Sequence, residues 1–370
     1  MTVQPVKLFY SRSSVVTDWK CARMRFWNYE YQGRGLTPNT TILPLFLGTV
    51  MHDGLSTIAH GVDIDEIATA AVTQIKATLI EAATADTESA EYFASEQAAL
   101  TEGLLRGYHR HVWPSFIERY EIVNIEPELT HEHDGLVFMA KPDLIVRDKS
   151  GDYHYIEYKS TSSVKEQWIS SWATAVQLHS SIRAVKSTLG IDITSVIIQG
   201  LNKGYASYGK QNSPMCYAYH KPGNPPFTPD IWQSEWKAGL KKYPIWERPG
   251  GVKQWVDEMS PETLGAQFPQ VPPIFIDDHL IDAFFRQRVT REHEIKDATS
   301  YINDEDASEE TKQNLLDEVF PQNFEACQPG WGSGCSYKKL CHGYNGDPLK
   351  AGFQTRHSHH QIEEDALNDI

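Results

Sequence analysis

An aspartate and a glutamate–lysine pair in the middle of the chain combine residue types that can hydrolyse a phosphodiester bond. Asp143 precedes a short apolar run, and Glu157 and Lys159 end a second strand-like run. Carboxylates provide the hard oxygen ligands that Mg²⁺ and Mn²⁺ prefer. Such a metal lowers the pKa of a bound water and stabilises the charge on a phosphate under attack. A lysine beside it can orient that water or neutralise developing charge.

The elements that position these groups can be predicted from the same stretch. The turn-forming residues Lys149-Ser150-Gly151-Asp152 join two apolar runs into a hairpin. Side chains alternate between the faces of a strand, so Glu157 and Lys159 share one face and Tyr158 points to the other. Antiparallel pairing returns the end of the second strand towards Asp143. We therefore expect both acids and the lysine to converge.

The Glu-x-Lys triplet is common and carries little information by itself. It also occurs at residues 235–237, 294–296 and 310–312, all in charged stretches predicted to be helical. Only the triplet at 157–159 ends a strand that pairs across a turn with an aspartate. The alternative interpretation is a surface hairpin with an incidental ion pair.

Three cysteines near the end of the chain form a second group with possible metal chemistry. Cys327, Cys335 and Cys341 lie in the segment CQPGWGSGCSYKKLC, where glycines let the backbone wrap around a bound group. Thiolates suit zinc or an iron–sulfur cluster, and spacing alone leaves both open. The fourth ligand would be Cys21, Cys216 or His342, and unligated thiols are the remaining alternative.

Composition places limits on the class of protein. The 370 residues, of which 40% are hydrophobic, are enough for a large globular core. No apolar run reaches membrane-spanning length, and the first residues lack a signal-peptide pattern, so we expect a cytoplasmic protein. Five cysteines do not form a secreted disulfide framework. The net charge of −15 argues against general coating of nucleic acid but leaves room for a local basic groove.

The order of predicted elements indicates an α/β or α+β core with a central mixed sheet flanked by helices. Helices come first, then a β-meander over 122–159, a helix over 167–189 and a buried strand at 195–201. We expect five regions: an N-terminal helical region (1–120), the sheet-bearing core (121–220), a Trp- and Pro-rich insertion or lid (221–275), a helical and cysteine-bearing region (276–345) and a mobile acidic tail (346–370).

Taken together, these motifs resemble a known family. An early cysteine on an aromatic and basic helix, then Gly-x-x-x-His at 48–52, Pro-Asp, Glu-x-Lys, a helix with glutamine and three late cysteines resemble the iron–sulfur branch of the PD-(D/E)XK nucleases. That branch includes CRISPR-associated exonucleases and RecB/AddB-type nuclease domains. The motif order covers the chain from Cys21 to Cys341, and the inserted regions match nothing in it.

The resemblance implies a restriction-endonuclease-like core and a role for each matching residue. It makes His52, Asp143 and Glu157 the ligands of Mg²⁺ or Mn²⁺, Lys159 the catalytic lysine and Gln177 a helix residue that positions substrate or lysine. It also implies a [4Fe–4S] cluster that ties the two chain ends together, on Cys21, Cys327, Cys335 and Cys341.

The chain departs from the family pattern at two points. Seven residues separate Cys327 from Cys335, where family members usually have two, and Ser181 stands where the family often has tyrosine four residues after the glutamine. Neither departure affects the acids or the lysine.

The insertion interleaves aromatic and basic side chains. Bases of single-stranded DNA stack on aromatic rings while lysines meet phosphates, and a helix with tryptophans in the core is the alternative. The candidate DNA contacts are Trp232, Trp236, Lys237, Lys241 and Lys242.

Two functions follow from these observations. The first is a metal-dependent DNA nuclease, specifically an exonuclease acting on single strands or free ends in repair or recombination. The chain contains no phosphate-binding loop of the G-x-x-x-x-G-K-[ST] type, so any helicase or recombination protein would be a separate partner. The second is a catalytically inactive DNA-binding or assembly module of the same fold, with zinc or iron–sulfur at the cysteines.

Overall fold

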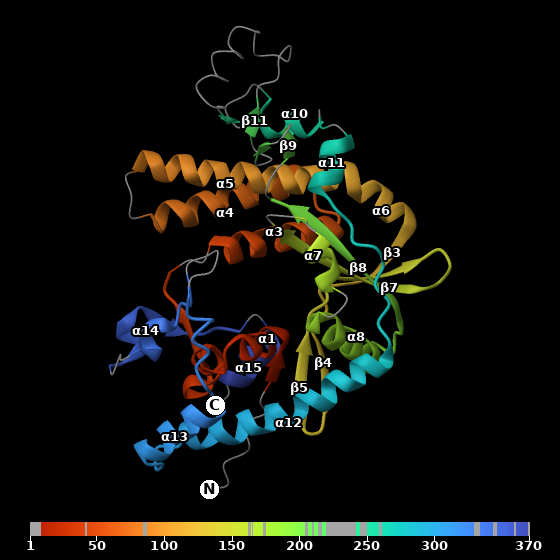
Figure 1. The fold of residues 1–370 in the computed structure, drawn as a ribbon. Helices are drawn as coiled ribbons and strands as arrows, with labels where there is room; N and C mark the ends of the chain where they lie inside the picture. The colour runs from red at the N-terminus through yellow and green to blue at the C-terminus, as the bar shows by residue number, and fades with distance from the viewer. Residues whose placement is uncertain are drawn as a thin grey trace.

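The computed structural model describes most of the chain, with gaps concentrated in the insertion. The described residues are 9–40, 43–83, 87–161, 164, 166–172, 175–203, 206–208, 211–213, 217–219, 242–244, 250–257, 259, 261–328, 334–342, 346–358 and 360–368. They form the mixed α/β arrangement that the element order predicts (Figure 1).

The central sheet has four strands in the order β3-β6-β7-β8. The strands are β3 (Tyr120–Ile125), β6 (Leu144–Asp148), β7 (Tyr153–Thr161) and β8 (Ile193–Asn202). β6 pairs antiparallel with β3 and β7, whereas β8 runs parallel to β7, which makes the sheet mixed. The predicted turn closes β6 onto β7, with the backbone N–H groups of Ser150 and Asp152 donating to the Asp148 carboxylate at 2.8 and 3.0 Å.

The predicted single meander is wrong, because its strands belong to two sheets. β4 (Leu129–His133) and β5 (Leu136–Ala140) form a hairpin, and β5 also pairs in parallel with β1 (Phe9–Ser11). The run from 136 to 146 is divided at Lys141-Pro142-Asp143. Proline has no N–H to donate to a sheet, so it ends β5 and leaves Asp143 just before β6.

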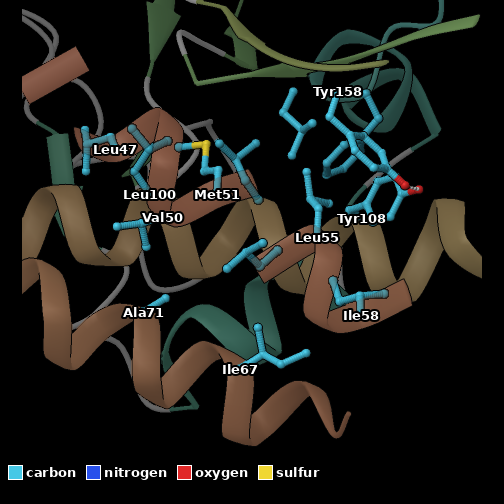
Figure 2. Packing of buried hydrophobic residues seen from close by; sticks show 14 of the residues in the cluster. Leu47, Val50, Met51, Leu55, Ile58, Ile67, Ala71, Leu100, Tyr108 and Tyr158 are labelled. Carbon is cyan, nitrogen blue, oxygen red and sulfur yellow. Dashed lines mark hydrogen bonds between the residues drawn. The ribbon is translucent and has the colours of Figure 1, made fainter. Parts of the chain in front are cut away.

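One face of the central sheet is covered by the N-terminal helices. They are α3 (Leu43–Ala59), α4 (Ile64–Glu81), α5 (Thr87–Gly107), the π-helix η3 (Tyr108–Val112) and α6 (Trp113–Arg119). Figure 2 shows leucine, isoleucine and methionine side chains of these helices packed towards the sheet, with Tyr108 beside Tyr158 of β7. The two phenol oxygens lie 2.8 Å apart. Tyr158 thus points away from the acids, as the strand alternation predicts.

The opposite face is covered by the helices that follow β7. They are α7 (Glu166–Ser171), α8 (Val176–Leu189) and α12 (Asp278–Ile302). Leu178, Ile182 and Phe285 pack with Tyr155 of β7 in a second core. α8 ends at Gly190, whose φ of +69° closes the helix in the left-handed region that favours glycine. The two cores lie on either side of the same strand, so β7 fixes the relative position of both helical layers.

The two ends of the chain pack against each other. The first helices are α1 (Arg12–Lys20), α2 (Ala22–Arg25), the π-helix η1 (Phe26–Glu30) and η2 (Tyr31–Gly33). They lie among α12, α13 (Glu309–Val319) and α14 (Lys338–Cys341) (Figure 1). Arg23 donates to the carbonyls of Phe320 and Leu316 at 2.8 and 2.9 Å. The single aromatic and basic helix expected here is interrupted at Cys21, which has an extended backbone.

The C-terminal segment, expected to be a mobile tail, contains regular structure. It includes η6 (Pro348–Ala351), β13 (Phe353–Thr355) and α15 (Gln361–Asn368), and β13 pairs antiparallel with β2 (Leu36–Pro38). Phe353 is buried against Leu36 and Tyr337. The acidic composition suggested mobility, but the pairing of β13 with β2 and the burial of Phe353 hold this part of the segment in place.

Most of the insertion lies outside the described residues. Described parts of 204–275 include four short strands, β9 (Ala206–Tyr208), β10 (Gln211–Ser213), β11 (Tyr217–Tyr219) and β12 (Lys242–Pro244), and two helices, α10 (Gly251–Asp257) and α11 (Pro261–Gln267). Trp232, Trp236, Lys237 and Lys241 lie outside the described residues, and of Lys242 only the backbone is described. Among the described helices, none is long and apolar enough to cross a membrane.

Candidate active site

The β6–β7 hairpin brings Asp143 and Glu157 opposite each other. Leu144 pairs with Ile156, so the residue before β6 faces the residue after Ile156 across the ladder. The backbone N–H of Tyr158 donates to Asp143 Oδ2 at 2.6 Å, which ties the aspartate to β7. The convergence expected from the turn and the strand alternation is therefore present in the fold.

Glu157 is a buried carboxylate surrounded by donors. Its side chain is 1% exposed and accepts hydrogen bonds from Lys159 Nζ, Gln177 Nε2 and the phenol of Tyr155. Lys159 also lies over the ring of Trp172, with Nζ 5.8 Å from the ring centroid. A buried carboxylate needs such partners, since an unpaired buried charge is strongly unfavourable. The arrangement holds Glu157 in one orientation in the middle of β7.

His52 reaches the same place from the helix α3 on the other side. Its Nδ1 lies 3.2 Å from Asp143 Oδ1. Burial lowers the pKa of His52, but the charge and hydrogen bond of Asp143 outweigh it and raise that pKa above its ordinary value. Burial raises the pKa of Asp143, yet His52, Lys159 and the Tyr158 N–H together bring it below its ordinary value. Both effects favour an ion pair between imidazolium and carboxylate.

Gln177 stands in the first turn of α8 and connects the helix to the acid. Its amide nitrogen donates to Glu157 and lies 3.4 Å from the phenol oxygen of Tyr155, while its Oε1 is buried and has no hydrogen-bond partner among the described residues. The carbonyl oxygen of the Gln177 side chain is thus a buried acceptor without a hydrogen bond from any described residue. The structure therefore brings together all five residues that the sequence assigned to this centre: His52, Asp143, Glu157, Lys159 and Gln177.

Tyr155 belongs to the site, and the sequence analysis missed it. It is fully buried and donates to Glu157, and Ser181 of α8 makes a side-chain hydrogen bond to it. Burial and the charges of Glu157 and Asp143 raise the pKa of Tyr155 well above its ordinary value, so the phenol keeps its proton and remains a donor. The sequence did contain a signal for this role, because Tyr155 lies two residues before Glu157 and therefore shares its face of the strand.

The donor types fit a hard divalent cation. Asp143 and Glu157 offer carboxylate oxygens, and His52 offers an imidazole nitrogen, at the end of the sheet. In the geometry of the described residues, no three His, Cys, Asp or Glu side chains lie close enough together to hold one metal ion. His52 contacts Asp143 and Glu157 contacts Lys159 instead. Metal binding would therefore exchange these ion pairs for bonds to the cation.

The four cysteines assigned to a cluster come from both chain ends and lie in the same region of the fold, but in the described residues no three of them are close enough to hold one metal ion. Cys21 and Cys327 are buried, and both contact Asn323: its N–H lies 3.4 Å from Cys21 Sγ, and Cys327 Sγ lies 3.5 Å from its carbonyl. Burial raises the pKa of Cys335, and Cys327 and Cys21 lie near enough to raise it further. Burial likewise raises the pKa of Cys341 to about 11, with Trp27 opposing the shift.

Of the two alternatives for the fourth ligand, His342 is exposed at the end of α14, and Cys216 lies outside the described residues. All four assigned cysteines are free thiols in the structure.

A mixed sheet between two helical layers, with an acid before β6 and an acid and a lysine on β7, is the arrangement of a phosphodiester-hydrolysing nuclease with a restriction-endonuclease-like fold. Comparison with protein families gives the same result, because the model of the PD-(D/E)XK nuclease superfamily matches residues 11–342. The chain belongs to this superfamily, whose members are metal-dependent nucleases that generally use Mg²⁺ or Mn²⁺. A search of curated proteins found no match. The matched range includes every residue assigned to the centre and the cysteines.

Proposed function

We propose that this protein is a metal-dependent deoxyribonuclease that degrades single-stranded DNA from its ends. The observation that carries the proposal is that Asp143, just before β6, lies next to Glu157 and Lys159 of β7 in a PD-(D/E)XK nuclease. His52 adds a nitrogen ligand from α3. A fold that had lost its activity would not need to retain this combination. DNA is the substrate class that the fold suggests, and a helicase or recombination protein would act as a separate partner.

The residues of the chain have distinct roles in this proposal. Asp143, Glu157 and His52 hold Mg²⁺ or Mn²⁺, which when bound lowers the pKa of a water and stabilises negative charge on the phosphate. Lys159 Nζ donates to the attacking water and neutralises charge that develops on the phosphate oxygens. Gln177 and Tyr155 donate to Glu157 and fix the orientation of its carboxylate on β7.

We further propose that Cys21, Cys327, Cys335 and Cys341 hold a [4Fe–4S] cluster, with zinc as the alternative. The support is the shared neighbourhood of four free thiols drawn from both ends of the chain. A bound cluster would hold α1 and α2 against α14 through covalent bonds to iron. Anaerobically purified protein should be brown and contain iron and sulfide, and Cys335→Ser should remove the colour. A colourless wild-type protein with one zinc ion would exclude the cluster.

The substrate proposal is tested with end-labelled DNA. Wild-type protein with Mg²⁺ or Mn²⁺ is expected to shorten linear single strands progressively and to leave circular single strands of the same sequence intact, with EDTA stopping the reaction. Cleavage of the circles would show an endonuclease. Binding of DNA without cleavage under any of these conditions would favour the inactive DNA-binding module.

A further inference from the structure

A cavity of about 530 Å³ lies where α1, α8 and α12 meet, next to the candidate active site. Its wall is mainly aromatic and apolar, and the side chains that matter are Trp19, Val176, His179, Leu280, Phe284 and Arg288. Trp19 is 58% exposed and Leu280 is 52% exposed. Large apolar side chains around a hollow are more often part of a binding surface than isolated exposed residues are.

The aromatic rings of this cavity are arranged for stacking. The imidazole of His179 lies parallel to the ring of Phe284, with centroids 5.7 Å apart and an interplanar angle of 26°. Trp19 lies nearly perpendicular to Phe284, with ring centroids 6.4 Å apart and an interplanar angle of 87°. Because the Trp19 side chain is largely exposed, a planar ring entering the cavity would meet accessible indole surface there.

The charged groups of the cavity are already paired, with one exception. Arg288 contacts Asp18 at 2.7 Å and Glu292 at 2.5 Å, and Arg291 contacts Asp18 at 3.0 Å. These pairs leave little positive charge to attract a phosphate. Nη2 of Arg288, however, is buried and has no partner among the described residues. Arg288 lines the cavity but is only 3% exposed, so this unpaired donor is buried in the cavity wall. A ligand with an acceptor would satisfy it once the wall moves slightly to expose the nitrogen.

The cavity is connected to the site through a single peptide unit. Val176 lines the cavity, and the next residue, Gln177, donates to Glu157. Successive helix side chains point about 100° apart, so the first turn of α8 presents one side chain to each place. The cavity is therefore near enough to the acids for one DNA strand to reach both places.

We propose that this cavity receives one nucleobase of the DNA strand being cut, stacked on Trp19, with a base acceptor directed towards Arg288. The inference rests on the proposed nuclease function. A base offers a π-face for the indole and carbonyl or ring-nitrogen acceptors for the orphan donor. Stacking is tolerant of sequence, so the cavity would fix the position of the strand without selecting its sequence.

The test removes the base and the indole separately and together. A short fluorescein-labelled single strand, with one abasic position moved along it, is titrated with protein in EDTA and followed by anisotropy. At one or two adjacent positions, loss of the base should weaken binding to the wild-type protein by about fivefold or more. The same abasic strand should bind Trp19→Ala as well as the intact strand does, and Trp19→Phe should restore much of the difference.

Tyr301→Ala provides the matched control. Tyr301 is 60% exposed on α12, as exposed as Trp19, and does not line the cavity. It should show the wild-type abasic penalty, and all variants should keep the wild-type melting temperature. An equal penalty in Trp19→Ala and wild type, or no penalty at any position, would overturn the cavity proposal. Cleavage of the intact strand with Mg²⁺ is assayed in parallel, so failure of the nuclease function is seen separately from failure of the cavity.

Discussion

The candidate active site differs in construction from the contact between the two chain ends. We call this contact, in which α1, α2 and η1 pack against α12 and α13, the joint. The two acids and the lysine of the site lie within one hairpin, where 15 positions separate Asp143 from the N–H that binds it. The joint forms between residues almost a chain length apart: 267 positions separate Arg25 from Glu292, and 297 separate Arg23 from the Phe320 carbonyl. The difference shows that local sequence places the two acids and the lysine, whereas contacts between distant residues hold the two ends of the chain together.

The joint is held by buried charges as well as by apolar contacts. Arg25 contacts Glu30 at 2.6 Å and Glu292 at 3.1 Å, and Arg288 links Glu292 to Asp18. All five side chains are at most 7% exposed. Buried charges are stable only when every partner is present, because desolvation of an unpaired ion costs several kcal/mol. Substitutions in the two regions should therefore affect different properties, activity for the hairpin and stability for the joint.

The largest effect on activity is expected from Glu157→Gln. The amide keeps the shape of the buried side chain but removes the negative charge that a metal requires. A metal contribution of several kcal/mol corresponds to a loss in kcat on the order of a thousandfold. Steady-state cleavage assays measure it, with melting temperature as the check on folding. Glu132→Gln, an exposed carboxylate on β4, should cleave at the wild-type rate, and an active Glu157→Gln would remove this glutamate from the site.

The largest effect on stability is expected from Arg25→Met. Removing this guanidinium leaves Glu30 and Glu292 without their partner, which costs about 3–5 kcal/mol for buried pairs. Urea unfolding measures the free energy of unfolding. Arg147→Met removes the exposed pair with Glu121 and should change little. Equal effects of the two substitutions would contradict the distinction between the joint and the surface.

Tyr155→Phe should have a smaller effect, confined to the site. It removes the phenol that donates to Glu157, and a hydrogen bond to a charged group contributes about 1.5–3 kcal/mol. We expect kcat to fall by roughly 10- to 100-fold and the Mg²⁺ concentration for half-maximal activity to shift. Tyr158→Phe is the control on the other face of β7: it loses the contact with Tyr108 and should lower stability while leaving the metal dependence unchanged. An identical response of the two variants would assign Tyr155 a purely structural role.

The smallest effect concerns the pH dependence of the joint. Burial raises the pKa of Asp18, but Arg291 and Arg288 outweigh it and lower that pKa below its ordinary value. A lowered folded-state pKa means that Asp18 contributes stability above the unfolded pKa, which is lost as pH falls below about 4. Urea unfolding should show Asp18→Asn less stable than wild type near neutral pH, with the difference shrinking in acid. A difference independent of pH would contradict the charge pairing.

The contrast between local and long-range contacts also explains which features the sequence could predict. The turn at 149–152, the alternation along β7 and the position of Asp143 depend on neighbouring residues, and each is present as predicted. The division of the meander into two sheets depends on β1 (Phe9–Ser11), which lies far from β5 in the sequence and pairs with it. The pairing of β13 with β2 likewise depends on partners over 300 positions away, which no local pattern encodes.

The candidate site contains both kinds of feature, those that the sequence predicts and those that only the fold reveals. His52, Glu157 and Lys159 could be assigned from motifs, whereas the hydrogen bond between Ser181 and Tyr155 required the packing of α8 on β7. The orphan donor of Arg288 depends on which of its nitrogens Asp18 and Glu292 occupy, and residue types alone do not determine that.

The central claim is that the β6–β7 hairpin is a metal-dependent phosphodiesterase site. The most direct measurement compares wild type with Asp143→Asn and Lys159→Met on 5′-labelled linear single-stranded DNA, with Mn²⁺ or Mg²⁺ titrated and an EDTA control. Wild type should release nucleotides only with metal, and both variants should be inactive at every metal concentration with unchanged melting temperatures. Wild-type cleavage in EDTA, or a well-folded Asp143→Asn variant that cleaves at the wild-type rate, would contradict the assignment.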